Sequence, residues 1–117
     1  MKHHKKGRKF GRVRKVRVGL MRSLARALVL HGKIETTVAK AKELRPFIEK
    51  LVTLSKKDTV ASRRLVEARM GNDKEVAAKL HKEIAPKYKD RPGGYTRIIK
   101  LGKKSDLSND KAVIELV

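Results

Sequence analysis

The sequence predicts an α+β protein in which helices are layered on one face of a small sheet. Two observations predict this fold class. Apolar residues recur at helical spacing through the middle of the chain, and β-branched runs lie at residues 33–37 and close to the C-terminus. Helices and strands in separate runs are typical of α+β folds, and three strands with an apolar face are about the minimum for an independently stable sheet.

The first element is a basic N-terminal extension, residues 1–18, which shows little periodicity. Residues 2–17 (KHHKKGRKFGRVRKVR) hold nine Lys and Arg and no acid, and the first acid of the chain is Glu35. The remainder, 19–117, is predicted to be a single α+β domain, since 117 residues fit one domain of common size.

The domain is predicted to open with a helix from Gly19. Leu20, Leu24 and Leu28 recur every four residues, and Gly32 stands where a left-handed C-cap would end the helix. The next segment, KIETT (33–37), predicts a short strand.

A long helix should follow, with Thr37 as its N-cap. Its predicted inward positions are Val38, Ala41, Leu44, Ile48, Leu51, Val52 and Leu54. Pro46 falls inside it, so either the helix kinks there or two helices meet. The apolar periodicity crosses Pro46 without a change of phase, which favours a kink.

Two shorter helices and two strands complete the domain. One helix is predicted over 60–70 and ends at Gly71, and another opens with a capping box at Asn72 and Glu75 and ends at Pro86. TRIIKL (96–101) and AVIELV (112–117) predict strands joined by a long hairpin loop.

The charge of the chain points to a polyanionic partner. The net charge is +20, which opposes compaction unless counter-charge is supplied. A membrane partner is disfavoured, because the longest apolar run is only Ala27–Leu30, and no secretory signal peptide is apparent. The chain has no cysteine, so disulfides and zinc ribbons are excluded. We expect a cytoplasmic protein that binds nucleic acid.

The extension supplies the predicted phosphate contacts. Arginine can grip phosphate with two donors, lysine acts as a mobile point charge, and glycine lets the backbone approach closely. The residues concerned are Lys2, Lys5, Lys6, Gly7, Arg8, Lys9, Gly11, Arg12, Arg14, Lys15 and Arg17. His3 is expected to contact phosphate or base rather than a metal. Arg22 and Arg26 share a face of the first helix and continue the basic surface.

The segment GGYTR (93–97) carries two interpretations that the sequence leaves open. It can be only a turn, or its backbone amides can meet a phosphate while Tyr95 stacks on a base or packs on a sugar and Arg97 reaches the nucleic-acid backbone. Because aromatic residues are scarce, recognition by shape and phosphate geometry is favoured over a stacking platform.

Catalysis is not indicated. The sequence contains no nucleophile–base pair with usable spacing and no cluster of metal-ligating residues, so no cofactor, metal or small-molecule substrate is predicted. The acids of the predicted helices are interpreted as members of ordinary charge pairs.

Four segments together resemble one known family. They are MKHHKKGRKFGR at the start, HGKIETTVAKAKELR (31–45), VASRRL (60–65) and GGYTRIIKLG (93–102), followed by a closing AVIELV. In this order and spacing they resemble the bacterial large-subunit ribosomal proteins numbered seventeen in that series, nearly from end to end.

The resemblance implies a fold and a set of partners. It implies an α+β fold with a small three-stranded mixed sheet, large-subunit ribosomal RNA as partner, and neighbouring ribosomal proteins near the exit of the peptide tunnel. Carried over by motif, the residues expected to face RNA are Lys2, His3, Lys5, Gly7, Arg8, Arg12, Arg22, Lys40, Lys42, Arg45, Tyr95 and Arg97. Arg14-Lys15-Val16-Arg17 replaces the family's usual Ser-Ser-His-Arg, and Ala39 replaces a common proline.

The function predicted from the sequence is a structural constituent of the large ribosomal subunit that binds folded ribosomal RNA. The alternative is a histone-like architectural DNA-binding protein, which would also use a basic arm. An amphipathic membrane-surface peptide is disfavoured, because residues 1–18 hold a single Phe.

Overall fold

Three antiparallel strands form the sheet of this protein. The computed structural model describes residues 14–102 and 110–117. Strand β3 (Lys111–Leu116) lies between β1 (Lys33–Thr37) and β2 (Thr96–Gly102), so the order is β1-β3-β2. Ile114 of β3 faces Ile34 on one side and Ile98 on the other. The α+β class is confirmed, and every strand pair is antiparallel, so the sheet is not mixed.

The helices fill the chain between and before the strands. Their bounds are α1 (Arg14–His31), α2 (Val38–Ser55), α3 (Val60–Arg69), α4 (Lys74–Lys79), the π-helical turn η1 (Leu80–Ile84) and α5 (Ala85–Lys87). All strands and the helices at 38–55 and 60–69 stand where the sequence predicts them, apart from one or two residues at their ends.

Helix α1 begins earlier than predicted. It starts at Arg14 rather than near Gly19, so the end of the predicted extension belongs to the helix. Lys and Arg are good helix formers, so residues 14–18 can be helical. Val16 and Val18 are exposed, so these residues have no buried apolar stripe by which the spacing of the sequence could have predicted the helix. Gly32 ends the helix as predicted, with φ +83° and its N–H bonded to the carbonyl of Leu28 at 2.7 Å.

Helix α2 is continuous across Pro46, so the possibility of two separate helices is excluded. Thr37 is its N-cap, as predicted, and the Thr37 hydroxyl accepts the backbone N–H of Lys40 at 3.2 Å. Of the predicted inward positions, five are fully buried and Val38 and Leu54 are partly buried. This helix is therefore the central support of the fold.

The second half of the chain departs from the prediction at two caps. The N-cap of α4 is Asp73, one residue after the predicted Asn72, because Asn72 takes a left-handed conformation with φ +66°. The sequence predicts that this helix ends at Pro86, but α4, η1 and α5 follow one another directly and the helical segment ends at Lys87. The π turn just before Pro86 widens the helix, and Ala85 N–H bonds to the carbonyl of Leu80, five residues back. This wider turn accommodates Pro86, which has no backbone N–H to donate.

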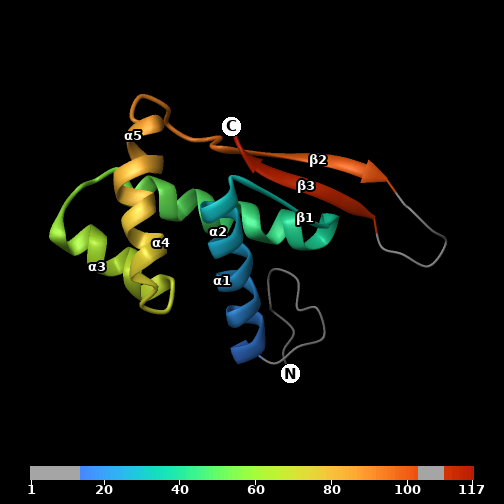
Figure 1. Ribbon diagram of the computed structural model, residues 1–117, viewed down its shortest axis with the longest axis horizontal. Coiled ribbons are helices and arrows are strands. Elements are labelled where there is room, and N and C mark those ends of the chain that lie inside the picture. The colour runs from blue at the N-terminus through green and yellow to red at the C-terminus, as the bar shows by residue number, and fades with distance from the viewer. Residues whose placement is uncertain (1–13, 103–109) are drawn as a thin grey trace, which may run out of the picture.

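Helices cover one face of the sheet, and the core lies between them. Figure 1 shows α1 across the middle of the molecule, the sheet on one side, and α3 and α4 on the other. The largest fully buried side chains include Leu28, Leu44, Ile48, Leu80 and Ile114. The opposite face of the sheet is open, and Ile99 is 45% exposed there. Among the described residues, no helix has the length and apolar character needed to cross a membrane.

Candidate nucleic-acid interface

The described part of the predicted RNA-binding extension lies on the first turns of α1. Arg14 and Lys15 are exposed and Arg17 is half-buried. No ion pair joins any of the three to another described residue. The helix therefore presents these cations without local neutralisation. The other predicted contacts of the extension lie outside the described residues: Lys2, His3, Lys5, Lys6, Gly7, Arg8, Lys9, Gly11 and Arg12.

Arg22 is engaged inside the fold. Its Nε donates to the carbonyl of Arg69 at 3.0 Å, and its Nη2 reaches the carbonyl of Ala68 at 3.5 Å. These carbonyls belong to the last turn of α3, where a cation is favoured by the helix dipole. Arg22 thus fastens α1 to the C-terminal end of α3, and two of its donors are already in use.

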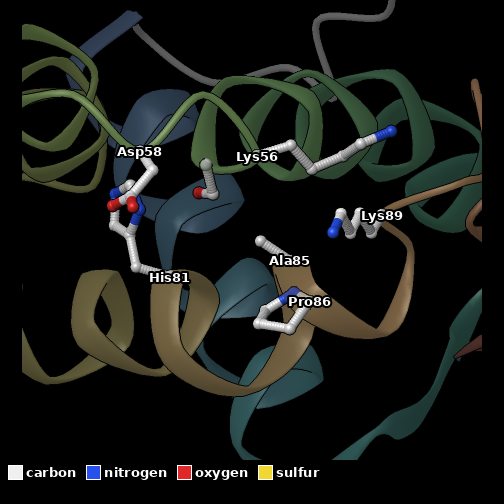
Figure 2. A pocket seen from close by; sticks show the side chains of 7 residues that line it. Lys56, Asp58, His81, Ala85, Pro86 and Lys89 are labelled. Carbon is white, nitrogen blue, oxygen red and sulfur yellow. The ribbon is translucent and has the colours of Figure 1, made fainter.

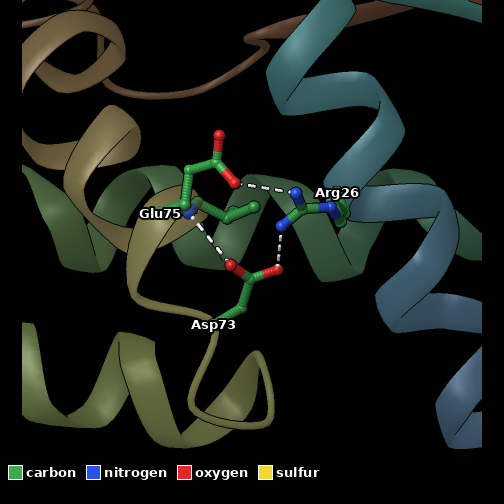
Figure 3. A network of polar contacts seen from close by, with 4 residues as sticks. Arg26, Asp73 and Glu75 are labelled. Carbon is green, nitrogen blue, oxygen red and sulfur yellow. Dashed lines mark hydrogen bonds and ion pairs between the residues drawn. The ribbon is translucent and has the colours of Figure 1, made fainter.

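Arg26 is likewise bound within the protein (Figure 3). Its Nη1 lies 2.6 Å from Asp73 Oδ2 and its Nη2 lies 2.7 Å from Glu75 Oε1. Asp73 also accepts the backbone N–H of Val76 at 3.3 Å, so the same carboxylate caps α4. Burial raises the pKa of Asp73, but the hydrogen bonds from Arg26 and Val76 outweigh it and lower the pKa overall. Arg26 therefore joins α1 to α4.

The cations at the start of α2 are more available. Lys42 is exposed and Lys40 is half-buried, and neither side chain has an ion pair with another described residue. Arg45 is also exposed, although its Nη2 donates to the carbonyl of Thr96 at 3.3 Å and its Nε lies 3.8 Å from Glu49. Lys42 and Arg45 are three residues apart, so they share the solvent face of the helix.

The backbone amides of the GGYTR segment are occupied by a carboxylate of the chain itself. Glu49 accepts the N–H of Gly94 at 3.3 Å, the N–H of Thr96 at 3.1 Å and the hydroxyl of Thr96 at 2.9 Å. The sequence predicts for Glu49 no more than an ordinary charge pair with a neighbouring base. In the structure it is the anion that this loop binds, so the amides of Gly94 and Thr96 are not free for phosphate.

Tyr95 is fully buried, with 0% of the residue exposed. Its hydroxyl lies 3.1 Å from Thr53 Oγ1 and accepts from Lys56 Nζ at 3.0 Å. Its ring lies against Tyr88, with the centroids 5.2 Å apart. Burial raises the pKa of Tyr95, but the hydrogen bond donated by Lys56 and the hydrogen bond shared with Thr53 lower this pKa overall. A buried ring has no face on which a base can stack, so Tyr95 does not belong to the proposed interface.

Arg97 projects from the open face of the sheet. It is 61% exposed in its side chain, and its Nε lies 2.5 Å from Glu115 on the neighbouring strand. The two residues are directly opposite in the β2–β3 register. This ion pair places an acid beside Arg97, which weakens the attraction of Arg97 for phosphate.

A hollow of about 310 Å³ lies where the end of α2 meets η1 and α5 (Figure 2). His81, Asp58 and Lys89 line it, and neither ring nitrogen of His81 has a hydrogen-bond partner among the described residues. Burial lowers the pKa of His81, and the nearby charge of Arg63 adds to this, so both favour the neutral form of the ring. No group of metal-ligating side chains occurs in the described parts of the chain.

Comparison with known proteins gives a consistent result. The family model described as ribosomal protein L17 matches residues 20–117. A protein named large ribosomal subunit protein bL17 from Persephonella marina is 56% identical over 118 residues, covering 100% of this chain and 95% of that relative. The protein of the same name from a Sulfurihydrogenibium species is 51% identical over 118 residues, covering 100% of this chain and 97% of that relative.

Proposed function

This chain belongs to the ribosomal protein L17 family, and from that premise we propose that it binds folded ribosomal RNA through the phosphate contacts of its basic N-terminal region and the adjoining helical edge. Membership of the family makes the chain a structural, non-enzymatic component of the large ribosomal subunit, acting in the cytoplasm within the ribosome. Its partners are accordingly ribosomal RNA and other ribosomal proteins. The alternative of a histone-like DNA-binding protein has no support.

One observation carries the proposal: the cations at the start of α1 form no ion pair with another described residue, while several acids of the body are used internally. Asp73 and Glu75 hold Arg26, and Glu49 holds the loop before β2. The body therefore leaves Arg14, Lys15 and Arg17 to an external anion. Each phosphate neutralised by such a cation releases condensed counterions and contributes affinity that does not depend on sequence.

The proposed RNA-facing set is narrower than the set predicted from the sequence. It keeps the contacts predicted before residue 14, namely Lys2, His3, Lys5, Lys6, Gly7, Arg8, Lys9 and Arg12, and of the described residues it keeps Arg14, Lys15, Arg17, Lys40, Lys42 and Arg45. Arg22 and Arg26 support the interface by fixing α1 against α3 and α4. By analogy with the family that the sequence resembles, we also place the protein near the exit of the peptide tunnel.

The test is the salt dependence of binding to large-subunit ribosomal RNA. The variant Arg14→Gln/Lys15→Gln/Arg17→Gln should bind more weakly, and the slope of log K against log salt should become shallower by about one for each phosphate that is no longer neutralised. The matched control replaces three exposed cations elsewhere, Lys74, Lys82 and Lys100, with Gln. Equal slopes for the α1 variant and wild type would show that these cations do not contact phosphate.

A further inference from the structure

We infer that a groove formed by α2, the end of α3 and the loop before β2 binds one nucleotide of the ribosomal RNA, with its phosphate between Lys50 and Arg69. This inference rests on the proposed RNA-binding function and adds a site that the sequence alone does not predict. The groove has a volume of about 390 Å³. Its walls include Lys50 and Leu54 of α2, Arg69 of α3, and Pro92, Gly93 and Tyr95 of the loop.

The charges of the groove favour an anion. Lys50 and Arg69 are exposed, and neither side chain has a hydrogen bond or ion pair with another residue in the described ranges. Glu49 is the one carboxylate among the described lining residues, and it is already bound to Gly94, Thr96 and Arg45. Two cations without an ion pair to a described residue therefore line the same groove, and the guanidinium of Arg69 can grip a phosphate with two donors.

The floor of the groove suits the rest of a nucleotide. Leu54 is partly buried and packs on the core, and Pro92 presents an apolar ring, while the fully buried Tyr95 supports these residues from below without offering a surface of its own. A ribose or the flat face of a base covers such a surface, while the attached phosphate stays within reach of the rim. A bare inorganic anion would leave this apolar floor uncovered.

The groove also lies close to α1, at the position of Arg22. Arg22 donates to the carbonyl of Arg69, so α1 touches α3 at the residue that supplies one of the two rim cations. Arg14 lies eight residues before Arg22, or about 12 Å along the helix. A single RNA segment can therefore contact the exposed cations of α1 and also place a nucleotide in the groove.

The first experiment compares RNA binding by the full-length variant Lys50→Gln/Arg69→Gln with wild type. We expect about tenfold weaker binding to large-subunit ribosomal RNA and a salt slope reduced by about one to two. The matched control, Lys74→Gln/Lys82→Gln, removes two exposed cations outside the groove and should bind as wild type does. Chemical footprinting of the RNA should show one or two nucleotides that become unprotected only in the groove variant.

The second experiment places a charge inside the groove without strain. Gly93 has an ordinary φ, and a Cβ added there meets nothing within 4 Å, so both Gly93→Glu and Gly93→Gln can be built. The two side chains have the same size, and only the first repels phosphate. We expect Gly93→Glu to bind RNA about tenfold more weakly than Gly93→Gln.

Three outcomes would overturn the inference. In the first outcome, Lys50→Gln/Arg69→Gln and Gly93→Glu bind RNA with wild-type affinity and salt slope, while the α1 variant still binds weakly. This result would refute nucleotide binding in the groove and leave the proposed function standing. Normal RNA binding combined with poor incorporation into the large subunit would identify an acidic protein segment as the occupant instead. If wild type itself fails to bind the RNA, the proposed function and the inference fall together. Unchanged thermal unfolding of each variant excludes misfolding as the cause of any weaker binding.

Discussion

Replacing Glu49 by alanine should destabilise the protein strongly, because its carboxylate fixes the loop that leads into β2. Thr96 is only 2% exposed, and Glu49 accepts both its N–H and its hydroxyl. Each buried donor left without an acceptor costs about 1–3 kcal/mol, so the two donors together are expected to cost about 3 kcal/mol after partial relaxation. Gly94 is exposed and can turn to water, and the exposed ion pair with Arg45 adds little.

The assay is urea unfolding of the free full-length protein, followed by circular dichroism. A destabilisation of about 3 kcal/mol corresponds to a fall of about 12 °C in the thermal midpoint of a 117-residue domain. Glu49→Gln should be destabilised about half as much, since it keeps one acceptor oxygen. The control Glu83→Ala replaces an exposed acid and should stay within about 0.5 kcal/mol of wild type.

A double-mutant cycle isolates the contact. Thr96→Val removes the hydroxyl but keeps the N–H, so its effect should overlap with that of Glu49→Ala, and the two destabilisations should not add. If Glu49→Ala unfolds at the wild-type urea midpoint with an unchanged m value, the carboxylate does not hold the loop, and the explanation given for the occupied amides is refuted.

Three further predictions concern stability. Gly19→Ala should stabilise α1 by about 1 kcal/mol, since nothing lies within 4 Å of an added Cβ, whereas Gly32→Ala should cost about 1–2 kcal/mol at φ +83°; urea midpoints that moved the same way would contradict this. The pKa of His81 is lowered in the folded state, so as the pH drops below about 6.5 the unfolded chain protonates this ring before the folded protein does, and the free energy of unfolding falls. His81→Phe should flatten this fall in thermal midpoints measured from pH 7 to 5. The pKa of Asp73 is also lowered in the folded state, so its contribution to stability is present above the ordinary pKa of Asp and disappears as the pH falls through the pKa of the folded protein. Arg26→Gln should therefore lower the thermal midpoint at pH 7 and have little effect near pH 2.

The features that the sequence predicts well are those decided by neighbouring residues. Leu20, Leu24 and Leu28 mark a helical stripe, Gly32 supplies the left-handed conformation that ends it, and Thr37 caps the next helix. Each depends on contacts within about one helical turn, so spacing is enough to read them. The three strands are also predictable, because β-branched residues gather in them.

The features that escape prediction depend on partners far along the chain. Arg26 and Asp73 are 47 residues apart, and so are Glu49 and Thr96. Nothing local distinguishes Arg26, held by acids of α4, from Lys42, which stays exposed. The burial of Tyr95 has the same origin, since its hydroxyl meets Thr53 and Lys56 of α2 and its C-cap. The sequence can thus identify a basic surface, but only the fold separates its free cations from those bound within the protein.

The order β1-β3-β2 has a consequence for how the protein is made. Strand β1 ends at Thr37, yet its partner β3 begins only at Lys111. During synthesis the N-terminal third leaves the translating ribosome long before the strand that closes the sheet has been polymerised. Until then, a chain segment rich in positive charge is exposed among cellular polyanions without a finished body behind it. We therefore expect the nascent chain to require shielding, by a chaperone or by early capture on its own RNA, before its last strand is added.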